Sequence, residues 1–273
     1  MLVFLARAGR WWLRAFTLAR ERAVIEALAS IDLQHMALLW AVVVLAAVLR
    51  AFTGFGFGLT AVPVFALMMP PTQAVVLSTS LTLGISLLTL RTYWGGFSPG
   101  QLLPVLVMSL FGTILGASLL TGFSPGQFQL WIGLTVILTC VVLSLYRPRR
   151  QKAGVALGGV TGLVSGVMNG AFAIPGPPLI IYAMATETEP ARTRSLLITF
   201  FAFSALLALA TYAAAGFFTP ASPWLFLLSF PAMYAGDKLG YRLFRRYGTA
   251  MYRRIALCLL FGLGLLITTR ALL

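Results

Sequence analysis

Charged residues are scarce in this sequence: they fill 10% of its 273 positions, whereas hydrophobic residues fill 60%. A soluble domain of this length cannot hide so much apolar surface in one core, so we predict a polytopic membrane protein. Acidic residues are the rarest charges, and the resulting net charge of +14 raises the question of nucleic acid. The arginines flank apolar segments, as the positive-inside rule expects, so we predict no nucleic-acid partner.

The residue types that build metal and catalytic sites are also nearly missing. His35 is the one histidine, which excludes a histidine-rich metal site. The two cysteines, Cys140 and Cys258, lie in apolar segments, and we interpret them as small lipid- or core-facing residues in preference to a disulfide. There is no Walker loop, and the glycines from Gly54 to Gly58 are no dinucleotide fingerprint, because Leu59 follows them. We predict no cofactor, no metal and no enzyme activity.

What the chain does contain is a glycine-rich stretch that occurs twice inside long apolar runs. The two copies are Thr53-Gly-Phe-Gly-Phe-Gly-Leu-Thr-Ala-Val-Pro63 and Ser165-Gly-Val-Met-Asn-Gly-Ala-Phe-Ala-Ile-Pro175. An alignment without gaps pairs Thr53 with Ser165 and Pro63 with Pro175. A plain transmembrane helix has no use for this composition, but a helix that opens to expose backbone amides does.

The copies divide the chain into four parts. Residues 1–32 form an amphipathic interfacial arm, with a cleaved signal peptide as the alternative, and residues 33–146 are a first transmembrane repeat. Residues 147–152 form a basic cytoplasmic linker, and residues 153–273 are a second transmembrane repeat. Gly112-x-x-x-Gly116 recurs as Gly236-x-x-x-Gly240, a spacing that lets helices approach closely, either within one protomer or between two.

The distribution of charge predicts that the two repeats are inverted. The uncharged turn 121–126 corresponds to the basic turn 244–252, and the uncharged Pro70-Pro71 corner corresponds to the loop before Arg192 and Arg194. Basic loops are cytoplasmic, so matching loops lie on opposite sides of the membrane. We expect an all-α fold with about eight to ten membrane segments and broken or re-entrant helices, as in secondary transporters. If every segment crosses, the arm lies outside; otherwise one glycine-bearing pair is re-entrant.

These motifs resemble the TauE/SafE family of sulfite and organosulfonate exporters. The resemblance is carried by the duplicated glycine element, by Gly176-Pro-Pro-Leu-Ile-Ile-Tyr182, and by Arg192 and Arg194 before an apolar helix, and it covers about residues 36–272. It implies a permease of the inner or plasma membrane with a small anionic substrate, and it suggests a homodimer. Family members carry consecutive glycines in the first copy, where this chain has Phe55 and Phe57.

The two glycine-rich elements are the candidate substrate site. Amides freed in a broken helix carry positive partial charge, which suits an anion, and Asn169 is the only asparagine of the chain. The alternative is close helix packing, with Asn169 as a structural hydrogen-bonding group. The candidate substrate-binding residues are Thr53, Gly54, Gly56, Gly58, Thr60, Ser165, Gly166, Asn169, Gly170 and Gly176.

Flanking residues receive lesser roles. Four prolines shape the breaks: Pro63, Pro175, Pro177 and Pro178. Arg192 and Arg194 either guide an anion at the cytoplasmic mouth or only set topology. Asp237 forms a local ion pair with Lys238, or else couples transport to protons.

The sequence thus predicts a secondary transporter that exports sulfite, an organosulfonate or a related oxyanion, bound at the midplane between the two elements. A transporter of a small carboxylate and a non-transporting membrane scaffold are the alternatives. The scaffold explains the hydropathy but not the duplicated breaks. The expected partners are the anionic substrate and the lipid bilayer.

Overall fold

The described part of the chain is all-helical. The computed structural model describes residues 33–53, 56–93, 98–146, 150–247 and 250–272, so the predicted arm 1–32, Gly54 and most of the linker arginines lie outside it. Its helices are α2 (Leu33–Thr53), α3 (Gly58–Phe65), α4 (Pro71–Tyr93), α5 (Pro99–Gly122), α6 (Pro125–Leu145), α7 (Val155–Phe172), α8 (Gly176–Thr186), α9 (Pro190–Ala214), α10 (Ser222–Tyr247) and α11 (Ala250–Leu272).

Helix length and hydropathy make this a multi-pass membrane protein. Among the described residues, seven helices are long and apolar enough to cross a bilayer, namely α2, α4, α5, α6, α7, α9 and α11. Helix α10 is 26 residues long but carries charged residues in its second half. Helices α3 and α8 have 8 and 11 residues. At 1.5 Å per residue they are about 12 and 16 Å long, too short for a hydrocarbon core of about 30 Å.

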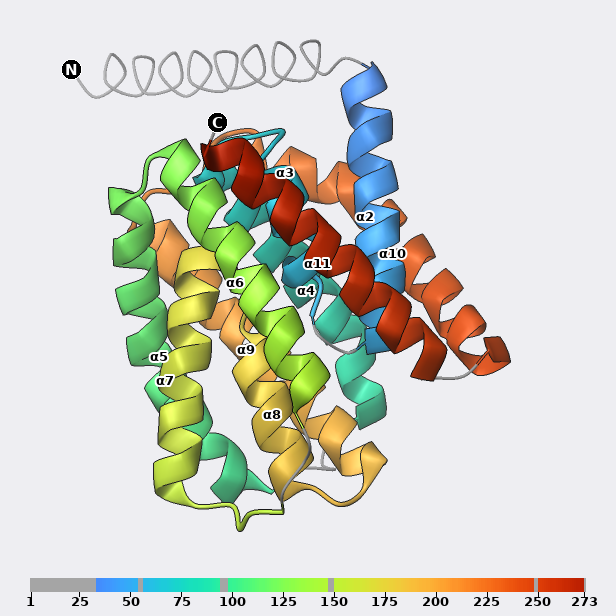
Figure 1. The fold of residues 1–273 in the computed structure, drawn as a ribbon. Coiled ribbons are helices and arrows are strands. Elements are labelled where there is room, and N and C mark those ends of the chain that lie inside the picture. Colours follow the sequence, from blue (N-terminus) through green and yellow to red (C-terminus); the bar gives the residue numbers. More distant parts are fainter. Residues whose placement is uncertain (1–32, 54–55, 94–97, 147–149, 248–249, 273) are drawn as a thin grey trace, which may run out of the picture.

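The two short helices leave the glycine breaks toward opposite ends of the bundle (Figure 1). Just after α3, the carbonyl oxygen of Ala66 accepts a 2.8 Å hydrogen bond from Gln129 Nε2, near the start of α6. Near the end of α8, the carbonyl oxygen of Ala185 accepts a 3.0 Å bond from the amide of Gln151, which lies after α6. Because α6 runs the length of the bundle, the pairs α2–α3 and α7–α8 open toward opposite faces.

Helix packing repeats when the two halves of the chain are exchanged. Helix α5 packs along α7 as α10 packs along α2, and α5 contacts α9 as α10 contacts α4. Helices α4 and α9 contact each other, and so do α6 and α11, which are corresponding helices of the two halves. This pattern is the one that a pseudo-twofold axis between the halves produces.

Glycines allow two pairs of helices to pack closely, α5 on α7 and α10 on α2. A Cβ atom added to Gly166 in α7 would come within 2.9 Å of the Cα atom of Gly112 in α5. A Cβ atom on Gly236 in α10 would come within 2.8 Å of the Cβ atom of Ala47 in α2. Both Gly-x-x-x-Gly spacings therefore join helices of one protomer, so these seams do not supply the surface of a homodimer.

The same seams fix how the halves correspond. Gly112 faces Leu163 and Gly166, whereas its counterpart Gly236 faces Val44 and Ala47, a shift of 119 positions (44 to 163 and 47 to 166). The ends of α2 and α7 (53 and 172) and the starts of α4 and α9 (71 and 190) give the same shift. The ungapped alignment, which pairs 53 with 165, is therefore displaced by seven residues in the first helix of each half.

Candidate functional site where the two breaks meet

The two glycine breaks contact each other in the interior. Gly58 begins α3, and a Cβ atom placed on it would collide with the backbone carbonyl of Ala173, which caps α7. The same Cβ atom would come within 3.4 Å of the hydroxyl oxygen of Ser78 on α4. Glycine is thus required at position 58 by the close approach of two backbones, and the sequence elements that predict the site do lie together.

The end of α7 is held by an unusual cap. Ala173 has φ 53° and ψ 36°, the left-handed conformation that glycine usually supplies at a helix end. Its amide donates to the carbonyl oxygen of Asn169 at 2.8 Å, and the amide of Ile174 donates to Met168 at 3.2 Å. The hydroxyl of Tyr212 on α9 donates to the carbonyl oxygens of Asn169 and Gly170, at 2.7 and 3.1 Å. The carbonyls of Met168, Asn169 and Gly170 near the end of α7 are therefore paired inside the protein.

The short helices present their amino-terminal ends to this junction. The first amides of a helix have no intrahelical acceptor and carry the positive end of its dipole. Neither α3, capped by Phe57, nor α8, capped by Pro175, has a side-chain cap. In α8 the second and third residues are Pro177 and Pro178, which have no N–H to offer. In α3 the amides of Thr60 and Ala61 already donate to the carbonyl oxygen of Phe57, at 3.2 and 3.1 Å.

Buried hydroxyls without a hydrogen-bond acceptor or donor lie on the helices around the junction. Ser78 on α4 and Ser165 on α7 are fully buried, and neither hydroxyl oxygen has a partner in the described part of the protein. Thr199 on α9 is also fully buried, and its hydroxyl oxygen likewise has no partner among the described residues. An unpaired buried hydroxyl costs free energy, on the order of 1–3 kcal/mol, so these groups are available to a polar ligand.

Three of the candidate residues serve packing in this conformation. The side-chain amide of Asn169 donates to the carbonyl oxygen of Ser204 on α9 at 3.0 Å, so it ties α7 to α9. Gly166 and Gly170 lie against the backbone of α5 at Ser109 and Thr113. These contacts favour the packing alternative for the α7 seam.

The other candidates lie around the first break and at the start of α8. Gly56 has φ 91°, a conformation for which glycine is favoured, and a Cβ atom there would lie 3.8 Å from the ring of Phe201. Thr60 is buried in α3, and Gly176 is buried at the first position of α8. Pro63 lies inside α3, and Pro175, Pro177 and Pro178 form the start of α8. Thr53 is the last residue of α2.

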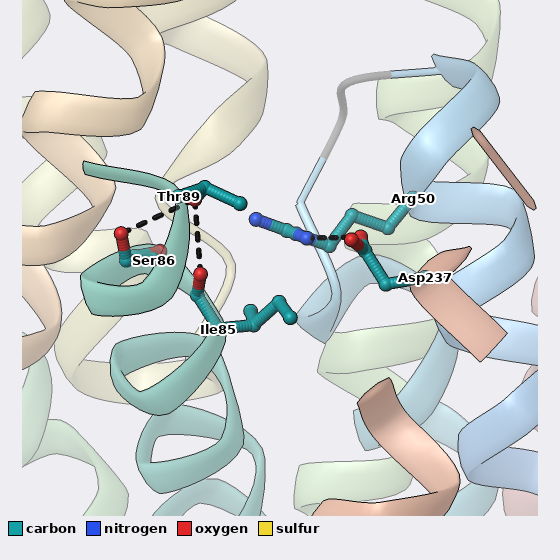
Figure 2. A network of polar contacts seen from close by, with 5 residues as sticks. All are labelled: Arg50, Ile85, Ser86, Thr89 and Asp237. Carbon is teal, nitrogen blue, oxygen red and sulfur yellow. Dashed lines mark hydrogen bonds and ion pairs between the residues drawn. The ribbon is translucent and has the colours of Figure 1, made fainter. Parts of the chain in front are cut away.

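The prediction of a local Asp237–Lys238 ion pair is wrong. Asp237 Oδ1 lies 2.7 Å from Nη1 of Arg50, in the last turn of α2, as Figure 2 shows. The ammonium of Lys238 instead lies 5.1 Å from the ring centroid of Tyr234. Consecutive helical residues point about 100° apart, so Asp237 faces the seam with α2 while Lys238 turns away from it.

The two arginines predicted at the cytoplasmic mouth differ in their surroundings. Arg192 pairs with Glu189 across 3.3 Å, and both side chains are more than half exposed, so this pair adds little stability. Arg194 lies in the second turn of α9 and is partly buried. Its positive charge repels that of Arg50.

One described groove lies away from the junction. It has a volume of about 770 Å³ between the end of α6 and the start of α11, and mainly apolar side chains line it. Cys140 and Cys258 both border it and carry free thiols, which agrees with their interpretation as small residues. It contains none of the predicted site residues.

Two polar residues beside the first break, Arg50 and Ser78, are not among the candidates predicted from the sequence. Arg50 is a lone cation four positions before Gly54, inside an otherwise apolar run. A single charge in a membrane segment indicates a candidate functional residue. Ser78 belongs to the hydroxyl-rich run Ser78-Thr-Ser80 in α4, which has no apparent use on a lipid-facing helix.

One comparison with known proteins finds a relationship. The sequence model of the family described as Sulfite exporter TauE/SafE matches residues 39–267, which extend from α2 into α11 and include both breaks. No curated protein and no solved structure matches the chain.

Proposed function

Because the chain belongs to the sulfite exporter TauE/SafE family, we propose that it is a secondary transporter that moves sulfite, an organosulfonate or a related small oxyanion out of the cytoplasm. The observation that carries the proposal is the contact between the breaks, Gly58 against Ala173. The starts of two helices without side-chain caps lie at this contact, the unpaired hydroxyl of Ser78 lies beside Gly58, and such groups recognise anions.

The two halves, residues 33–146 and 153–273, act in this proposal as inverted repeats, and the anion binds between them. The exchange of packing partners between the halves supports this division. In transporters built from inverted repeats, one repeat rocks against the other around the bound substrate. The basic linker 147–152 and the turn 244–252 then face the cytoplasm.

Export of an anion needs no coupling ion. A membrane potential of 100 mV, negative inside, favours the exit of one negative charge by about 2.3 kcal/mol. That free energy sustains a concentration ratio of about fiftyfold. The membrane potential and the substrate gradient are therefore sufficient driving forces for the proposed reaction.

The test is counter-flow of labelled sulfite in proteoliposomes that contain the purified full-length protein. We expect saturable flux, and we expect thermal stabilisation by sulfite or a sulfonate that exceeds the effect of acetate or another simple carboxylate. Gly58→Leu, which forces α3 away from Ala173, should abolish flux. Gly262→Leu on α11, where an added Cβ atom meets no atom within 4 Å, is the matched control and should retain it. No saturable flux of any sulfur oxyanion would rule out the proposed substrate class.

A further inference from the structure

The Arg50–Asp237 ion pair places two charged side chains between α2 and α10, where apolar side chains of similar volume could also pack. The Arg50 side chain is 10% exposed and that of Asp237 is 22% exposed. Desolvating such a pair costs as much as its attraction returns, and apolar residues of similar volume usually serve stability as well or better. Ionisable residues within membrane segments tend to mark the paths of substrates or ions. The position of this pair therefore indicates a function beyond packing.

Arg50 occupies a special place in the repeat. The shift of 119 positions that relates the first helices of the two halves sets Arg50 opposite Asn169 (50 to 169). Each residue lies in the last turn of a helix that ends at a break, with α2 ending at Thr53 and α7 at Phe172. The two breaks are thus preceded by a cation on one side and by an amide on the other.

The groups around the guanidinium are suited to holding an anion. Asp237 contacts one nitrogen, Nη1, whereas a guanidinium presents five N–H donors that match the oxygen atoms of an oxyanion. In the view of Figure 2, Ser86 and Thr89 of α4 are drawn on the side of the guanidinium away from Asp237. Thr89 already donates its hydroxyl proton to the carbonyl oxygens of Ile85 and Ser86, at 2.9 and 3.2 Å. Of these two hydroxyls it is therefore that of Ser86, buried and without a partner in the described residues, that has a proton to offer an anion.

Among the described charged residues, Asp237 is the counter-ion of Arg50 when no substrate is bound. Arg194 on α9 repels Arg50, and Lys238 on α10 faces Tyr234. The other described acidic residues, Glu187 and Glu189, precede α9 in a loop. The carboxylate of Asp237, paired with the largely buried Arg50 beside a break, holds the place that a small anionic substrate can take.

We propose that Arg50 is the anion-binding cation of the transporter and that the substrate oxyanion displaces Asp237 from it. This inference rests on the proposed function. Asp237 lies on α10 and Arg50 on α2, so the ion pair ties the second half of the chain to the first. When the substrate displaces Asp237, Arg50 exchanges its ion pair with the second half for a bond to the substrate. Substrate binding is thereby coupled to the movement of one half against the other.

The experiment measures sulfite affinity and counter-flow for wild-type protein and four variants of the full chain. Arg50→Gln should weaken sulfite binding at least tenfold, the effect of losing a charge-assisted hydrogen bond. Asp237→Asn removes the internal competitor, so it should tighten binding about tenfold while slowing counter-flow. Lys238→Gln, the adjacent charge on α10, is the matched control and should leave both unchanged.

A fourth variant separates binding from folding. Arg50→Met combined with Asp237→Leu keeps the volume of the pair without its charges, so it should unfold at the wild-type temperature or above and bind no sulfite. If wild-type protein binds no sulfur oxyanion, the proposed function fails and this inference fails with it. If wild-type protein binds sulfite and the double variant binds it equally well, the inference alone is overturned.

Discussion

Among single residues, Ala173 has the most demanding backbone conformation, because it is the one non-glycine residue with positive φ in the described part of the chain. A left-handed conformation costs a residue with a Cβ atom about 1 kcal/mol or more. The two amide bonds at the end of α7 and the approach of Gly58 keep Ala173 in place. The left-handed conformation of Ala173 is retained because these surrounding contacts stabilise it.

Tyr212 is the side chain that supports this strained turn from α9. Tyr212→Phe removes the hydroxyl that donates to Asn169 and Gly170 and leaves their buried carbonyl oxygens with one donor fewer. We expect a loss of about 1–2 kcal/mol in the free energy of unfolding, since the ring itself still packs against Phe217. Thermal unfolding of the purified protein should show a lower midpoint. Thr211→Val, one residue earlier on the partly exposed face of α9, should change the midpoint less.

At the scale of helices, the close packing of α5 on α7 depends on glycine. Gly116 in α5 lies against the backbone of α7, where a Cβ atom would come within 2.7 Å of the amide nitrogen of Ala171. Gly116→Leu should therefore separate α5 from α7, lower the unfolding midpoint by several degrees and abolish flux. Gly126→Leu in α6, where an added Cβ atom meets nothing within 4 Å, should be tolerated. Equal midpoints for the two variants would contradict this assignment of the seam.

The helices and the pairing of the breaks could be predicted from the sequence, but the register of the halves could not. Prolines and glycines mark the starts of α4, α5, α6 and α8 directly, because their backbone chemistry ends one helix and begins the next. The ungapped alignment is displaced by seven residues, which is close to two helical turns. A slip of two turns keeps small residues on the same helical face, so the pattern alone does not reveal it.

The partner of Asp237 could not be predicted for a related reason. Arg50 and Asp237 are 187 positions apart, and nothing in the local pattern of either helix points to the other. Only the packing of α10 on α2 through Gly236 and Gly240 brings them together. Predictions from neighbouring residues therefore favoured Lys238, which has the right charge but points to another side of the helix.

For the molecule as a whole, the orientation in the membrane is the prediction that the charge pattern makes most directly. In a variant with both cysteines replaced by alanine, Lys152→Cys should react with an impermeant maleimide only from the cytoplasmic side. Gln127→Cys, in the first turn of α6 at the opposite end of that helix, should react only from outside. Labelling of both positions from the same side would contradict the assignment of the basic linker to the cytoplasm.

The contact between Gly58 and the carbonyl of Ala173 also has a mechanical consequence. It joins two backbones with no side chain between them, so no change of rotamer can absorb a displacement there. We therefore expect the pairs α2–α3 and α7–α8 to turn about this point and not to slide past it. A small rotation of either pair about this contact would displace the far ends of α3 and α8 by a larger distance. Those ends lie at opposite faces of the bundle.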